Sequence, residues 1–471
     1  MGPRITFIGA GSVGFTRKLI ADLLTVEALR DITIVLMDID RHNLDLIEAV
    51  VRRDLTANHL ENIKVETTLD QRKAVTGSRY VIDVARVGGL EAFTFDVEIP
   101  LTYGVDQCVG DTLSAGGVFY GQRTIPHILG LCKDMREVSD PQVLFLNYTN
   151  PNAMNTWAAN QYGGIRTLGL CHGVQHGHEQ IAEVLGLPQA EVDIICAGIN
   201  HQTWYIQVKH RGKDLRGDLL AAFEKHPVYS VQEKVRIDIL RRFGYYSTES
   251  NGHLSEYLAW YRKRPGEIRQ WVDMSDWIHG ETGGYLRYCR EQRAKFETEA
   301  RAYQTQKPFL YSKENRSSEH GSYIIEALET GTRYRGHFNV VNRGAITNLP
   351  DDAVVEVPGY VDANGISIPR VGELPLGAAA ICNQSISVQR LAVEAAVHAD
   401  DALLRQAVLL DPLVGAVCNP PEVWQMVDEM LVAEAAWIPQ YAQAVTEARA
   451  RLSQGKAIPT SHYKGGALLT P

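Results

Sequence analysis

The chain has 471 residues, 45% of them hydrophobic and 22% charged, a balance typical of a water-soluble globular enzyme with two domains. No apolar run is long enough for a membrane span, and the net charge of −9 argues against a nucleic-acid partner, so we expect neither. Seven scattered cysteines without a CxxC pair argue against disulfides or structural zinc. Because the N-terminus reads as a first strand and not as an export signal, we predict a cytoplasmic protein.

Short apolar runs alternate with helical periodicity in the first third of the chain, which is typical of a parallel α/β sheet. The predicted strands are 5–8, 32–37, 80–84 and 143–146. Between the last two, residues 86–121 are rich in Gly and Thr. We expect this segment to leave the carboxyl ends of the strands as a loop that builds the active site.

The pattern after Pro151 is less regular. Strands are predicted at 167–170, 194–199 and 354–360, and helices over 388–451. We therefore predict an α/β fold in which residues 1–170 form a Rossmann-type doubly wound parallel sheet, as in the lactate and malate dehydrogenases. Residues 171–471 form a mixed α+β domain for substrate binding, metal binding and oligomerisation. The tail 464–471 is expected to be disordered.

Residues 9–14 read Gly-Ala-Gly-Ser-Val-Gly and lie between a predicted strand and a helical pattern. Glycines in this setting allow a tight turn, close approach of a pyrophosphate and close packing of the helix. Asp38 ends the second strand, where a carboxylate accepts a ribose hydroxyl and repels a 2′-phosphate. The sequence predicts an NAD site formed by Gly9, Gly11, Ser12, Val13, Gly14 and Asp38.

Polar clusters follow three predicted strands, at 147–151, 171–174 and 198–201. If these strand ends lie near the cofactor crevice, the Cys171 thiolate and the His201 imidazole can converge on a divalent ion and leave positions open for substrate. From spacing alone, a buried structural cysteine and a hydrogen-bonded structural histidine explain the pattern equally well.

The chain contains, in this order, the segments GAGSVGFTRKLIADL, LMDID, GDTLSAGG, NYTNPNAMNTWA, LGLCHGVQ, AGINH and NVVNRGAITNLPDDAVVEVPGYVDANGI. Together they resemble glycoside hydrolase family 4, most closely its melibiase-type α-galactosidases, from Ile5 to about Met430. The resemblance implies an α-galactosidase that uses NAD and a divalent metal, usually Mn²⁺, and that forms a homodimer or homotetramer.

The implied mechanism is redox elimination, an exception to the two-carboxylate scheme of glycoside hydrolysis. NAD⁺ takes hydride from C3 of the sugar, a base removes the acidified C2 proton, the C1 substituent leaves, water adds, and the hydride returns. An α-glucosidase or α-galacturonidase of the same family, and a sugar dehydrogenase that releases NADH, stay open as alternatives.

The resemblance also implies roles for individual residues. Cys171 and His201 match the family's metal ligands, and His201 is placed beside the substrate as well. His172 matches the proton donor to the leaving group. Asn150 matches a substrate-binding amide, with Asn147 as a second one in support.

Asp111 matches a carboxylate that raises the basicity of the catalytic base, although a turn or N-cap acid explains it as well. The base itself stays open, because family members use tyrosine or aspartate in this part of the chain. Tyr246 and Glu249 are the candidates, and Tyr245, His253 and Tyr257 are alternatives. The polar cluster expected to line the sugar pocket consists of Glu249, Ser250, Asn251, His253 and Glu256.

Specificity in the resembled family follows the residues after the metal cysteine, which here read Cys171-His172-Gly173-Val174. The proline typical of the phospho-glucosidase branches is absent, so we expect a substrate without a 6-phosphate. Melibiases have serine where this chain has Gly173. We expect the missing side chain to admit a different substituent at C4 or C5 of the sugar.

Overall fold

Six parallel strands form the first part of one large sheet, in the order β3-β2-β1-β4-β5-β6. They are β1 (Arg4–Ile8), β2 (Thr33–Met37), β3 (Lys64–Thr68), β4 (Tyr80–Asp83), β5 (Leu144–Asn147) and β6 (Thr167–Gly169). This is the strand order of dinucleotide-binding folds, so the predicted Rossmann-type sheet is confirmed. β3 was not predicted, because Lys-Val-Glu-Thr-Thr carries only one large apolar residue.

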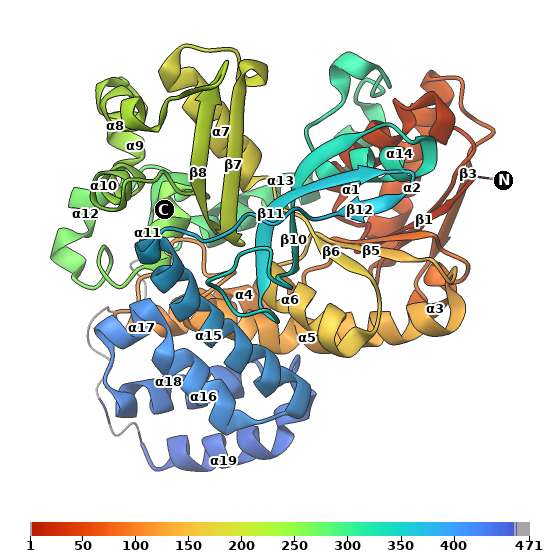
Figure 1. Cartoon of the computed structure of the whole chain (residues 1–471). Helices are drawn as coiled ribbons and strands as arrows, with labels where there is room; N and C mark the ends of the chain where they lie inside the picture. The colour runs from red at the N-terminus through yellow and green to blue at the C-terminus, as the bar shows by residue number, and fades with distance from the viewer. Residues whose placement is uncertain (1, 456–457, 459–471) are drawn as a thin grey trace.

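The computed structural model describes residues 2–455 and 458, so the tail 464–471 lies outside the described residues. Within the described ranges, no helix combines the length and the apolar character that crossing a membrane requires. Helices cover both faces of the parallel sheet (Figure 1). One group consists of α1 (Val13–Leu24), α2 (Arg41–Ala57) and α14 (His320–Thr330), and the other of α3 (Gln71–Val75), α5 (Ser114–Val138) and α6 (Asn152–Ala158).

The segment 86–121 is mostly helical, which corrects the prediction of a long loop. It forms α4 (Gly89–Thr102) and the first part of α5, and only residues 103–113 connect the two without regular structure. The glycines that suggested a loop serve close packing instead. A Cβ atom on Gly117 would lie 2.4 Å from the backbone of Thr112, and one on Gly116 would lie 2.7 Å from the carbonyl oxygen of Asp96.

The sheet continues beyond β6 through antiparallel strands that come from residues 192–367. These are β10 (Tyr334–Val341), β11 (Val354–Asp362), β7 (Val192–Ile199), β8 (Gln202–His210) and β9 (Lys213–Asp214), with β12 (Gly365–Ser367) paired to β11. The predicted strands at 167–170, 194–199 and 354–360 are confirmed as β6, β7 and β11. The sheet runs on without a break across residue 170. The domain division predicted there stays a prediction.

One row of residues crosses the junction between the two halves of the sheet. Gly169 of β6 pairs with Asn339 of β10, which pairs with Glu356 of β11, which pairs with Gly198 of β7. At Gly169 a Cβ atom would lie 2.1 Å from the side-chain oxygen of Asn152, so only glycine fits there without a shift. The row fixes the relative positions of the segments that follow β6 and β7.

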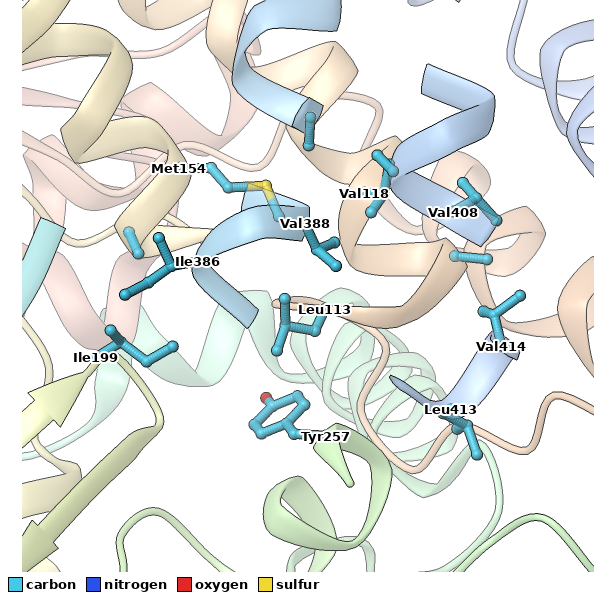
Figure 2. Packing of buried hydrophobic residues seen from close by; sticks show 14 of the residues in the cluster. Leu113, Val118, Met154, Ile199, Tyr257, Ile386, Val388, Val408, Leu413 and Val414 are labelled. Carbon is cyan, nitrogen blue, oxygen red and sulfur yellow. The ribbon is translucent and has the colours of Figure 1, made fainter. Parts of the chain in front are cut away.

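The predicted helical region 388–451 is confirmed as helices that pack against α5, against α4 and against one another (Figure 1). They are α15 (Leu376–His398), α16 (Asp401–Leu410), α17 (Pro412–Val417), α18 (Pro420–Ala433) and α19 (Ala442–Ser453). Figure 2 shows Val118 of α5 and Val388 of α15 in the shared core, with Leu413 and Val414 of α17 nearby. The remaining helices are α7 (Gly173–Leu185), α8 (Arg216–Lys225), α9 (Tyr229–Gln232), α10 (Lys234–Phe243), α11 (Asn251–Tyr257), α12 (Ile268–Trp271) and α13 (Gly284–Thr305).

A buried ion cluster joins α4, α5 and the end of α18. Arg123 of α5 donates hydrogen bonds of 2.9 and 2.7 Å to Asp96 of α4 and also pairs with Glu434, and all three side chains are buried. Because two carboxylates would be left buried without a counter-charge, removal of the guanidinium should be costly.

We predict that Arg123→Leu lowers the free energy of unfolding by about 3–5 kcal/mol. Arg264→Leu is the control, because Arg264 forms an exposed pair with Glu267 at 3.2 Å and such pairs contribute about 0–1 kcal/mol. Urea denaturation followed by tryptophan fluorescence measures both. Equal losses in the two variants would contradict a stabilising role for the cluster.

Candidate active site

Cys171 and His201 come together in space, although they follow different strands. Cys171 lies just after β6, and His201 lies in the turn between β7 and β8 with φ of 63°. With Glu249 they form a group whose ligand atoms all lie within 4.8 Å of one another. The structure therefore brings the two predicted metal ligands together and adds a carboxylate to them.

A chain of hydrogen bonds fixes the orientation of the His201 ring. Asn150 donates to Asp111 at 2.8 Å, and the Thr112 hydroxyl donates to the other oxygen of Asp111 at 2.9 Å. The Thr112 oxygen lies 2.8 Å from Nδ1 of His201, so with its own proton committed it accepts one from Nδ1. Nε2 then keeps a free lone pair that points toward Glu249, as a metal ligand requires.

Glu249 lies between the thiol and the imidazole. Its Oε2 atom is 3.4 Å from the Cys171 sulfur and 3.6 Å from Nε2 of His201. Burial raises the pKa of Glu249, and positive charge on the surrounding imidazoles, led by His201 and His253, would lower it to about 2. The carboxylate oxygen faces both predicted metal ligands. The position thus favours Glu249 as a metal ligand over its predicted role as the base.

Gly173 is needed because the Glu249 carboxylate lies against it. A Cβ atom at this position would lie 2.0 Å from Oε2 of Glu249. The expectation that Gly173 leaves room for a sugar substituent is therefore corrected, since a carboxylate of the protein already fills this space. The pattern Cys-His-Gly-Val and the position of Glu249 are two parts of one arrangement.

The predicted pocket-lining cluster 249–256 divides into two groups. His253 faces His201 with ring centroids 4.9 Å apart, and burial lowers its pKa to about 4, so its imidazole is neutral. Ser250 caps α11 by accepting from the backbone of His253. Asn251 accepts from the backbone N–H of Val235 at 2.8 Å. Ser250 and Asn251 thus hold the fold together, which corrects their predicted place in the sugar pocket.

Glu256 anchors the loop that carries Asp111. It is buried, and its carboxylate accepts hydrogen bonds from the backbone N–H groups of Cys108, Val109 and Gly110 at 2.5, 2.9 and 3.0 Å. Burial raises its pKa to about 7, against the effect of these hydrogen bonds. Its predicted place in the sugar pocket is therefore corrected to a positioning role.

Tyr246, a candidate for the base, and Tyr245, one of the alternatives, lie in different surroundings. Tyr246 is buried between Phe223, at 4.2 Å between ring centroids, and the guanidinium of Arg236 at 4.2 Å, and its hydroxyl bonds Gln180. This packing position argues against Tyr246 as the base. Tyr245 lies beside Arg216, at 5.6 Å.

Tyr257, which the sequence left as an alternative, lies at the site. Its ring is parallel to that of His201 at 6.5 Å, and its buried hydroxyl forms no hydrogen bond of ordinary geometry within the described part of the chain. Burial raises the pKa of Tyr257, and the nearby charges of Glu256 and Asp111 add to this rise.

The other predicted residues lie on both sides of the metal group. The His172 side chain is 46% exposed, and its Nδ1 atom is 3.8 Å from Glu319, which also pairs with Lys18 of α1 at 3.3 Å. His172 can therefore be oriented through one ring nitrogen and present the other to a substrate. Asn147 is buried and bonds Thr149 through its side-chain oxygen, which agrees with a supporting role, and its contact with substrate stays a prediction.

Three features of the predicted dinucleotide loop agree with cofactor binding. The backbone N–H of Gly11 donates to Asp38 at 2.7 Å, and a Cβ atom on Gly11 would lie 2.6 Å from that carboxylate. Gly9 has φ of 76° and lies against the backbone of Ala85. Gly14 faces open space, so its expected role in helix packing is wrong and its lack of a side chain leaves room for a ligand. Ser12 and Val13 begin α1, whose first N–H groups suit a phosphate.

Two ionisable residues near the site, the half-buried Arg86 and the buried Glu356, were not predicted. Arg86 follows β4 and lies over the rings of Phe93 and Tyr285 at 4.6 and 5.5 Å, with one guanidinium nitrogen lacking a partner among the described residues. Glu356 lies 3.4 Å from the Asn200 side chain, and burial together with Glu249 raises its pKa to about 8. Neither belongs to a local motif, so no spacing could have indicated them.

Comparison with known proteins agrees with this arrangement. The profile of the Family 4 glycosyl hydrolases matches residues 4–187, and that of the Family 4 glycosyl hydrolase C-terminal domain matches residues 196–414. An alpha-galactosidase of Rhizobium meliloti (strain 1021) is 58% identical over 465 residues, which is 98% of this chain and 94% of the relative. An alpha-galactosidase of Bacillus subtilis (strain 168) is 35% identical, covering 93% of this chain and 99% of the relative.

Solved structures share the fold. A structure from Bacillus subtilis superposes with a TM-score of 0.79 at 26% identity and covers 91% of this chain and 99% of that one. A 6-phospho-alpha-glucosidase from gut microorganisms, in complex with NAD and glucose-6-phosphate, superposes with a TM-score of 0.76 at 24% identity, covering 93% and 99%. On the family match over both halves, the chain belongs to the family 4 glycosyl hydrolases.

Proposed function

We propose that this glycosidase is an α-galactosidase that requires bound NAD and a divalent metal ion, with Mn²⁺ as the first candidate. The observation that carries the proposal is the group of Cys171, His201 and Glu249, which lies beside the hydrogen-bonded pair of Asp111 and Asn150. A thiol and an imidazole in place of two separated carboxylates do not suit direct displacement at C1. The galactoside follows from the relative that is 58% identical.

The residues present fit both NAD and a divalent metal ion. The loop of Gly9, Gly11 and Gly14 would hold the pyrophosphate at the start of α1, and Asp38 would accept the ribose hydroxyl of NAD. Ile39, whose side chain is 89% exposed directly after Asp38, offers apolar surface to an adenine ring. When bound, NAD supplies reversible hydride transfer, and the metal polarises the sugar hydroxyls.

The metal ligands are proposed to be the sulfur of Cys171, Nε2 of His201 and a carboxylate oxygen of Glu249. The Thr112 hydroxyl holds His201 in the tautomer that leaves Nε2 free. Burial and the neighbouring carboxylates raise the pKa of the Cys171 thiol. The thiol would therefore lose its proton as the metal ion binds to the sulfur.

The remaining roles concern the substrate. Asn150, oriented by Asp111, would bind a sugar hydroxyl, and His201 lies next to that position. His172 would protonate the departing oxygen. Tyr257 is our candidate for the residue that removes the C2 proton, since it stacks on His201 and its hydroxyl is not committed to a well-formed hydrogen bond in the described structure.

The test of this function uses metal-stripped protein and p-nitrophenyl α-galactoside, with NAD⁺, Mn²⁺ and a thiol reductant added singly and together. We expect nitrophenol release only with all three, without net formation of NADH. Stoichiometric NADH without nitrophenol would instead identify a sugar dehydrogenase. Faster turnover of the α-glucoside or the α-galacturonide would replace the galactoside as substrate while keeping the chemistry.

A matched pair of tyrosine variants tests the proposed base. Tyr257→Phe should lower kcat by about 10²–10⁴-fold, the usual contribution of a positioned proton acceptor, and leave Mn²⁺ affinity unchanged. Tyr246→Phe removes the same hydroxyl from a packing position and should keep kcat within about threefold, since it loses one hydrogen bond of modest net value. Steady-state rates and Mn²⁺ titration measure both. The assignment is wrong if the two variants lose activity equally.

Gly173→Ser tests the arrangement around Glu249. The new Cβ atom must displace the carboxylate that lies 2.0 Å away, so Mn²⁺ affinity should fall by about 10–100-fold. Gly217→Ala in α8 is the control, because nothing lies within 4 Å of its Cβ position. Titration of Mn²⁺ by electron paramagnetic resonance reports binding without activity. Unchanged affinity in Gly173→Ser would remove Glu249 from the ligand set.

A further inference from the structure

A second hollow of about 1030 Å³ lies outside the candidate active site. It is bordered by the segment before β6, the end of β10 with the loop that follows, and the segment after β12. It begins at the amino end of β6, whereas Cys171 follows the carboxyl end of that strand. None of the residues assigned to the metal, the cofactor or the sugar belongs to its lining.

Three arginines line this hollow, each from a different segment. Arg166 precedes β6, Arg343 follows β10, and Arg370 follows β12. All three are exposed, and within residues 2–455 and 458 none of them forms an ion pair or a side-chain hydrogen bond. Three unneutralised positive charges thus share one concave surface of a chain whose net charge is −9.

One acidic side chain shares the hollow with these arginines. Asp351 also lines the hollow, yet none of the three arginines forms an ion pair with it. Its neighbour Asp352 does form a salt bridge, with Arg390 of α15. Like charges that share one concave surface give it a positive potential, which favours the binding of an anion.

The loop that carries Arg343 is rigid and strained. Arg343 has a backbone φ of 43°, a left-handed conformation that residues other than glycine rarely adopt. The buried Asn342 side chain holds this loop by donating to the carbonyls of Ile346 and Leu349 at 2.9 and 3.0 Å. The backbone N–H of Arg343 donates to the Asp351 carbonyl at 2.8 Å. The guanidinium is therefore presented from a fixed backbone at some conformational cost.

We propose that this hollow binds a small multivalent oxyanion, with Arg166, Arg343 and Arg370 as its charged contacts. The planar guanidinium fork matches the oxygens of phosphate and carboxylate groups alike. Aliphatic side chains, including Ile366 and Ile368, lie in the same lining and suit an anion with an organic part. The site is independent of the proposed glycosidase chemistry, because it shares no residue with it.

The test is isothermal titration of the full chain, stripped of metal and saturated with NAD⁺, with inorganic pyrophosphate in one arm and citrate in the other. We expect saturable binding of at least one anion at one site per chain. Preference for pyrophosphate identifies a phosphate ester as the natural ligand class, and preference for citrate identifies a polycarboxylate.

Variants assign the binding to the hollow. Arg370→Ala should weaken binding about tenfold or more, because each charge-assisted contact is strong. Arg343→Gly should weaken it similarly while leaving the thermal midpoint unchanged or higher, since glycine accepts the left-handed backbone. Arg343→Lys keeps the charge but loses the fork, and binding should fall several-fold. Arg449→Ala, an exposed arginine on α19, is the control and should bind as the wild type does.

Three results of the titrations would overturn the proposal. They are the absence of saturable binding in both arms, an equal loss of binding in Arg449→Ala, and full binding by the protein that carries Arg343→Gly and Arg370→Ala together. Sedimentation velocity of the same variants gives a further check. If Arg343→Gly or Arg370→Ala dissociates an oligomer, the hollow is an interface with a second copy of the chain and not an anion site.

Discussion

The site depends on a constraint that a continuous sheet imposes on two distant segments. β10 and β11 insert between β6 and β7, and one row of paired residues leads from Gly169 to Gly198. Cys171 and His201 follow the two ends of this row and meet with Glu249 within 4.8 Å. A strand pair from late in the sequence therefore decides where two earlier segments come together.

Buried polar contacts around Cys171, His201 and Glu249 fix the orientation of the His201 side chain. Glu256 holds the backbone before Asp111 through three N–H groups. Thr112, in the same loop, is hydrogen-bonded to His201 and orients its ring. Because each hydrogen-bonding partner is itself fixed, His201 is restricted to one tautomer. A buried polar group that loses its hydrogen-bonding partner is costly. These hydrogen bonds therefore hold the loop 103–113 in a single conformation.

The two concave regions of the protein are built on different principles. At the active site, Asp111 and Glu249 each lie against polar partners from the protein itself. In the hollow beside β6, three arginines lack partners altogether in the described structure while the loop under Arg343 is tightly held. The first region is organised for chemistry on a bound sugar, and the second for charge recognition.

Local patterns in the sequence determined the dinucleotide loop at Gly9–Gly14 and the strands around it, because strand periodicity and glycine turns act over a few residues. The roles of Gly173, Thr112 and Tyr257 were decided only by the tertiary structure. Gly173 leaves room for a carboxylate that lies far away in the sequence, and Thr112 bridges two segments. The sequence placed Tyr246 ahead of Tyr257 as the base, and only packing distinguishes a tyrosine buried against Arg236 from one stacked on His201. Contacts between distant segments leave no local pattern, which is why the sequence by itself gave Thr112 no role and ranked the tyrosines differently.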